Sequence, residues 1–111
     1  MSHAAIDPHT FDELQANAGA DFVAELVDTF AEEAPPLLTE MRSALAAGAA
    51  ERFRRAAHSL KSNGSTFGAT RLADMARALE LEGLPASAAP VDALVQEFEA
   101  TLAALQTLAR P

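Results

Sequence analysis

The stretch AAHSLKSNGSTFGA (residues 56–69) decides how this chain folds, because its apolar residues recur with the period of an α-helix. At about 100° per residue, they gather on one side of a helix that we predict from Ala50 to Phe67. That side must face a core, and it consists of Phe53, Ala56, Ala57, Leu60, Gly64 and Phe67. Gly68 would end the helix, since glycine is common just past a helix C-terminus.

Both flanks of this stretch continue the helical period, and no segment alternates like a β-strand. The apolar pattern predicts further helices over about residues 10–17, 21–48, 69–83 and 90–108. Thr10 with Glu13 fits a capping box for the first of them, and Pro90 suits the first turn of the last. The longer helices carry apolar stripes that include Phe22, Phe30, Met41, Leu72, Leu79, Phe98 and Leu108.

Pro35 and Pro36 interrupt the second of these helices. A proline inside a helix removes a backbone hydrogen bond and usually kinks or breaks the helix. The segment could therefore be one kinked helix or two shorter ones. The apolar stripe resumes in phase after the prolines, which favours one kinked helix.

Four amphipathic helices with short connections predict an all-α fold, namely an antiparallel four-helix bundle with a short additional N-terminal helix. A chain of 111 residues is long enough for one core but not for two. We therefore expect a single domain over residues 6–111, preceded by a flexible N-terminal tail at residues 1–5.

The composition excludes several classes of function. The chain has no cysteine, so a disulfide, a thiolate nucleophile and a cysteine-based metal site are impossible. Its net charge of −8 makes nucleic-acid binding unfavourable, because phosphates are bound by positive charge. The chain also has no tryptophan or tyrosine for base stacking. No apolar run approaches the roughly 20 residues that span a bilayer. The N-terminal residues do not resemble a secretory signal, so we expect no membrane contact and a cytoplasmic location.

His58 lies clear of the apolar stripe, about 140° from Phe53 on the helical wheel. We expect it to be exposed in mid-helix, with Arg54 one turn before it and Lys61 shortly after it. Adjacent cations disfavour protonation of the imidazole and leave a nitrogen lone pair free near neutral pH. A phosphoryl group on that nitrogen would find Lys61 one turn away to balance its charge.

A simpler interpretation remains open from the spacing alone. An exposed histidine on a helix usually has no special role, and a basic run is usually a solvated face. Arg52 and Arg55 could simply balance acidic residues on adjoining helices. His3 and His9 are six residues apart, unlike helical metal ligands, so we predict no metal site in the chain.

The segment AHSLKSNGSTFGATRLADMARALE resembles the signature of the histidine-containing phosphotransfer (HPt) domain. In that family a histidine is followed by leucine and lysine, by a glycine ten positions on, and by a leucine–glutamate pair ending the next helix. The matching positions here are His58, Leu60, Lys61, Gly68, Leu72, Leu79 and Glu80. The upstream segment FVAELVDTFAEEAPPLLTEM is also similar to the family's second helix, so the resemblance covers nearly the whole chain.

The resemblance implies a four-helix bundle that carries phosphoryl groups in a multistep two-component phosphorelay. By that likeness His58 accepts the phosphoryl group of a receiver-domain aspartate and passes it to another receiver aspartate. Lys61 would stabilise the phosphoryl charge, and Gly68 would leave room for the receiver. The family often has glycine directly after the lysine, where this chain has Ser62, whose hydroxyl could donate a hydrogen bond to a phosphoryl oxygen.

The expected partners are receiver domains of a hybrid histidine kinase and of response regulators. Candidate partner-binding residues are Arg54, Arg55, Ser62, Ser65 and Gly68. The chain has no ATP-binding signature, so we expect a carrier without kinase activity of its own and without a cofactor. The Mg²⁺ for the transfer would be supplied at the partner receiver site, and we expect the protein to be a monomer.

The alternative is a non-catalytic helical adaptor that binds a receiver domain without phosphoryl exchange. A helical bundle hosts many functions, and the fold alone does not choose between them. The intact pair of His58 and Lys61 favours the carrier, because an adaptor would not need it.

Overall fold

The computed structural model describes residues 6–110. Within this range the chain forms five α-helices, and its only β-type pairing is one isolated bridge between Ile6 and Ala69. The helices are α1 (Pro8–Ala18), α2 (Ala20–Ala47), α3 (Ala50–Thr66), α4 (Thr70–Glu82) and α5 (Ala89–Ala109). The predicted all-α class is confirmed. The predicted tail at residues 1–5 lies outside the described residues.

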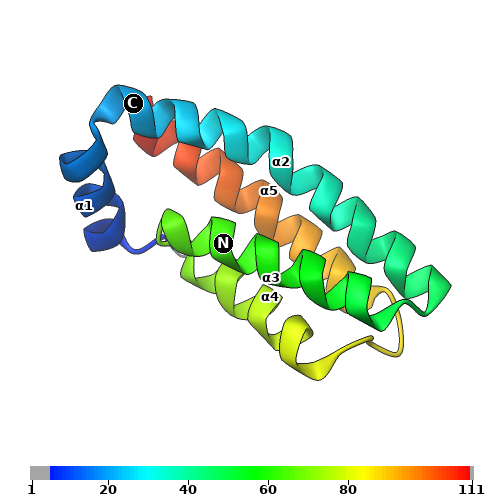
Figure 1. Ribbon diagram of the computed structural model, residues 1–111. Helices are drawn as coiled ribbons and strands as arrows, with labels where there is room; N and C mark the ends of the chain where they lie inside the picture. Colours follow the sequence, from blue (N-terminus) through cyan, green and yellow to red (C-terminus); the bar gives the residue numbers. More distant parts are fainter. Residues whose placement is uncertain (1–5, 111) are drawn as a thin grey trace.

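The four longer helices lie side by side, and α1 lies across one end of them (Figure 1). Helix α3 contacts both α2 and α4, and α5 also contacts both of them, so each of the four has two neighbours. Helix α1 contacts α2. This ring of contacts is consistent with the predicted bundle and its additional N-terminal helix.

Helix α1 begins earlier than the sequence analysis predicts. Its N-cap is Asp7, whose side chain accepts a hydrogen bond from the backbone N–H of His9, and Pro8 occupies the first turn. Thr10 is therefore not the cap, and its hydroxyl instead donates to Asp7 Oδ2 at 2.7 Å. The capping-box prediction is wrong because aspartate followed by proline is itself a strong helix start.

Helix α2 runs without interruption through Pro35 and Pro36, so the alternative of two shorter helices is wrong. Both prolines are exposed, while Ala34, Leu38 and Met41 are buried. The apolar stripe therefore keeps its phase across the prolines, as the sequence analysis assumed. Packing of the buried stripe outweighs the backbone hydrogen bonds that the prolines remove.

The inner faces of α2, α3, α4 and α5 form the core. The predicted inner face of α3 is buried along its whole length, including Phe53 and Leu60 at 0% exposure. Phe30 of α2 packs its ring against Phe67 and Phe98, with ring centroids 5.4 Å and 5.3 Å apart. These contacts tie the turn after α3 to α2 and α5, and so hold α3 in place with its opposite face toward solvent.

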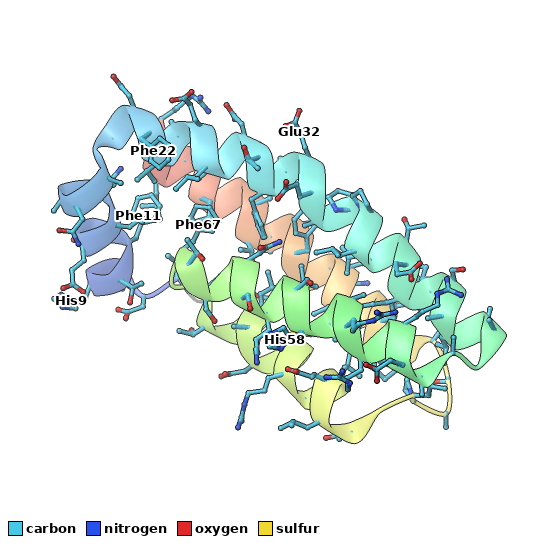
Figure 2. The ribbon with its side chains drawn as sticks, in the orientation of Figure 1. His9, Phe11, Phe22, Glu32, His58 and Phe67 are labelled. Carbon is cyan, nitrogen blue, oxygen red and sulfur yellow. The ribbon has the colours of Figure 1, made fainter. Side chains whose placement is uncertain are left out.

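Two residues of the predicted stripes are not in the core. Phe22 and Leu108 are 52% and 44% exposed, and both lie in terminal turns of their helices, where fewer neighbours cover them. Figure 2 shows Phe22 near the start of α2. In residues 6–110, no helix has both the length and the apolar content needed to cross a bilayer.

Candidate functional site

His58 lies in the middle of α3, on the face opposite the buried stripe. Its side chain is 53% exposed, which confirms the placement expected from the helical wheel. Figure 2 shows His58 on the side of α3 that faces α4. The imidazole is therefore open to solvent on one edge and close to a second helix on the other.

Glu80, near the end of α4, is the direct partner of this imidazole. Its Oε2 lies 2.7 Å from Nδ1 of His58, although the two residues are 22 positions apart. Only 12% of the Glu80 side chain is exposed. Glu80 matches a position of the family signature, but its place in the sequence indicates no function for it. Only the packing of α3 against α4 reveals the contact.

Lys61 binds the other oxygen of the same carboxylate. Its Nζ lies 3.0 Å from Glu80 Oε1, and its side chain is 26% exposed. Lys61 and then His58 lower the pKa of the Glu80 carboxyl group, so Glu80 is ionised at neutral pH. The structure thus brings the predicted pair, His58 and Lys61, together on one carboxylate.

The carboxylate decides which nitrogen of His58 is available. An ionised carboxylate can only accept hydrogen bonds, so Nδ1 must carry the proton that it donates to Glu80. In the neutral ring the lone pair then lies on Nε2, at the solvent-facing edge. A neutral imidazole with an exposed Nε2 is a nucleophile for an incoming electrophile such as a phosphoryl group.

The other cations of α3 do not surround the imidazole as the sequence analysis expected. Arg54 is paired with Glu51 on its own helix, with Nε 3.0 Å from Oε1. Arg52 reaches α2 and bonds Glu40 at 2.9 Å, which agrees with the simpler interpretation of that residue. A carboxylate, not a cation, is the charged group that contacts the ring of His58.

Of the other candidate partner-binding residues, Arg55, Ser62 and Ser65 are exposed on α3. Arg55 helps to line a shallow hollow between α2 and α3 together with Glu40, Arg52 and Ser59. Their exposure leaves them accessible, and their binding to a partner stays a prediction.

Gly68 is buried, and this chain occupies the space beside it. A Cβ atom at Gly68 would lie 2.8 Å from Cβ of Thr10 and 3.0 Å from the carbonyl oxygen of Asp7. The backbone N–H of Asp7 also donates to the carbonyl of Gly68 at 2.7 Å. The N-terminal segment crosses the turn between α3 and α4 and occupies the space where a Cβ would lie, and the contact of Gly68 with a receiver stays a prediction.

His9 lies far along the chain from this site and pairs with Glu13 at 3.4 Å on an exposed face. His3 lies outside the described residues. In the part of the chain that the structure covers, no three His, Cys, Asp or Glu side chains group together as metal ligands would.

Comparisons with known proteins agree on one family. A family model described as "Hpt domain" matches residues 25–107. The chain is also similar to a crystal structure of histidine-containing phosphotransfer protein B (HptB) from Pseudomonas aeruginosa PAO1, with a TM-score of 0.75 and 28% sequence identity. That similarity covers 98% of this chain and 94% of the other. No match was found among curated proteins. Because the family model spans more than half of the sequence, the chain belongs to the Hpt domain family.

Proposed function

We propose that this protein is a phosphocarrier in a multistep phosphorelay. His58 accepts a phosphoryl group from the aspartyl phosphate of one receiver domain and passes it to the aspartate of another. One observation carries the proposal: the exposed imidazole of His58 is held through Nδ1 by a largely buried carboxylate that also binds Lys61. Membership of the Hpt domain family and the likeness to HptB support a phosphotransfer role.

The transfer requires no proton to move on this chain. The Nε2 lone pair of His58 attacks phosphorus while the bond from phosphorus to the aspartyl oxygen breaks, and that electron pair leaves with the aspartate carboxylate. Glu80 keeps the ring oriented through Nδ1 during the attack. Lys61, one turn along α3, supplies positive charge beside the transferring group. Transfer to the second receiver follows the same path in reverse.

The remaining parts of the reaction belong to the partner. We assign the aspartate and the Mg²⁺ of each step to the receiver domains of a hybrid histidine kinase and of response regulators. Exposed residues around His58, including Arg54, Arg55, Ser62 and Ser65, would face them. A carrier of this kind needs no ATP site, and we expect it to act as a cytoplasmic monomer.

A small phosphoryl donor tests the proposal without any partner. The purified protein is incubated with phosphoramidate, and its intact mass is recorded beside those of His58→Gln and His9→Gln. His58 is half exposed, so the His58→Gln protein should still fold, which a thermal unfolding curve checks. His9 is a matched control because it is also exposed and also pairs with a glutamate.

The expected result is one acid-labile adduct on the wild type and on His9→Gln, and none on His58→Gln. A receiver domain added to the adduct should then remove it. No adduct on any variant would contradict the carrier and support the adaptor. An adduct that persists in His58→Gln would show that His58 is not the acceptor.

A further inference from the structure

We propose that Glu80 sets how readily the phosphoryl group leaves His58, by keeping a proton on Nδ1 of the phosphorylated ring. This inference rests on the proposed phosphocarrier function. It concerns the second half of the reaction, the transfer away from His58, and makes Glu80 a positioning residue that acts through the imidazole. With the carboxylate in place the phosphohistidine would transfer its phosphoryl group readily, and without it the phosphohistidine would be more stable.

The geometry holds Glu80 against the ring from a separate helix. Its neighbours in α4, Ala76 and Leu79, are 0% and 7% exposed and anchor that face of α4 in the core. Helix α4 packs along α3 and places Glu80 Oε2 2.7 Å from Nδ1. The side chain of His58 is 53% exposed, and Nε2 lies across the ring from this contact. A phosphoryl group on Nε2 therefore does not displace the contact between Nδ1 and the carboxylate.

The charge of the ring follows from this arrangement. Before transfer the neutral ring carries its proton on Nδ1 and its lone pair on Nε2. Formation of the bond from Nε2 to phosphorus consumes that lone pair, so the ring becomes a cation as long as Nδ1 keeps its proton. An adjacent carboxylate favours the cationic form, because opposite charges at hydrogen-bond distance stabilise each other.

The proton on Nδ1 matters when the phosphoryl group departs. Cleavage of the bond between Nε2 and phosphorus returns the electron pair to Nε2. A protonated ring then leaves as neutral imidazole, whereas a ring that has lost its Nδ1 proton would have to leave as an imidazolate anion. The neutral imidazole is the far better leaving group, so the protonated ring passes its phosphoryl group to a receiver aspartate or to water more readily.

The positive charges near the ring oppose the effect of the Glu80 carboxylate. Lys61 of α3 binds the second oxygen of Glu80, and Arg54 of α3, although paired with Glu51, contributes a more distant positive charge. On the α2 side, Glu40 is engaged by Arg52. The lowered pKa of Glu80 keeps its carboxylate ionised throughout the neutral range. Glu80 is therefore the negative charge that directly contacts this imidazole.

The test compares the phosphorylated wild type with Glu80→Gln and with Glu82→Gln. Glu82 is a matched control because it lies in the same last turn of α4 and is exposed. Each protein is phosphorylated with phosphoramidate, freed of donor, and followed by ³¹P NMR between pH 5 and pH 9. We expect the wild type and Glu82→Gln to lose phosphate with the same pH profile. Hydrolysis slows with rising pH as the phosphorylated ring loses its Nδ1 proton. In Glu80→Gln this slowing should begin about one pH unit lower, because a charge in contact with a half-exposed ring shifts proton binding by about that much. Hydrolysis of Glu80→Gln at pH 8 should then be about tenfold slower.

A spectroscopic readout separates this role from a structural one. In ¹⁵N-labelled wild-type phosphoprotein, the Nδ1–H of His58 should still be visible at pH 8, and its loss there would overturn the inference even if Glu80→Gln failed to fold. Identical pH profiles for folded Glu80→Gln and wild type would overturn it too. Those outcomes leave the phosphocarrier intact, because the proposed function is contradicted only by the absence of an adduct on the wild type or by an adduct that persists in His58→Gln.

Discussion

The replacement of Gly68 by alanine tests whether the N-terminal segment, not a partner, occupies the space beside the turn between α3 and α4. Gly68 has a φ of +75°, a conformation that L-residues rarely adopt. A new Cβ would also lie 2.8 Å from Cβ of Thr10 and 3.0 Å from the carbonyl oxygen of Asp7. Gly48 provides the matched control, because its φ is +66° but a Cβ there would meet nothing within 4 Å.

The two variants separate backbone strain from steric overlap. A left-handed conformation costs a non-glycine residue about 1–2 kcal/mol. Alanine also lowers the conformational entropy of the unfolded chain, which offsets about 0.4–1 kcal/mol of this cost. Gly48→Ala should therefore lose about 1 kcal/mol of unfolding free energy. Gly68→Ala carries the same cost and an overpacking cost of about 1–3 kcal/mol, for a total of about 2–4 kcal/mol.

Urea unfolding, followed by circular dichroism, measures both losses on the same scale. The folded Gly68→Ala protein should still accept phosphate from phosphoramidate, because the substitution lies ten residues from His58. Equal losses in Gly68→Ala and Gly48→Ala would refute the packing of the N-terminal segment on Gly68. If Gly68→Ala keeps its stability but no longer accepts a phosphoryl group from a receiver, the result would support the partner role that the family resemblance implies.

Three further substitutions test other features of the fold. Thr101→Val should raise the unfolding free energy by about 1–2 kcal/mol, since the Thr101 hydroxyl is fully buried and has no hydrogen-bond partner among residues 6–110; a loss in urea unfolding would show that it has one. Pro36→Ala should raise the melting temperature and increase the unfolding free energy by up to about 3 kcal/mol, because it restores a backbone hydrogen-bond donor inside α2. A lower melting temperature would show that the proline stabilises the helix at this position. Arg52 lowers the pKa of Glu40, so Glu40 stabilises the fold above its unfolded pKa and that contribution is lost as the pH falls through the lower folded value. Glu40→Gln should thus destabilise the protein at pH 7 but not at strongly acidic pH, and a deficit independent of pH, or one shared by the exposed Glu32→Gln, would argue against the pair.

The helices were predictable because their signal is local. The inner face of α3 can be assigned from a period of 3.6 residues, and the same period places His58 on the outside. The start of α1 was missed because two helix-start signals, at Asp7 and at Thr10, compete within a few residues. The continuity of α2 through Pro35 and Pro36 was favoured but not decided, since it depends on packing that outweighs a local penalty.

The sequence by itself determined the all-helical class, the exposed position of His58, and the placement of Lys61 one turn away, because neighbours along one helix follow from spacing alone. The tertiary structure decided what surrounds the imidazole. Glu80 reaches Nδ1 from 22 positions away, and the N-terminal segment covers Gly68. Such contacts depend on how two helices cross and where a turn lies against another segment. These geometries arise from packing of the whole core, which no single stretch of sequence encodes.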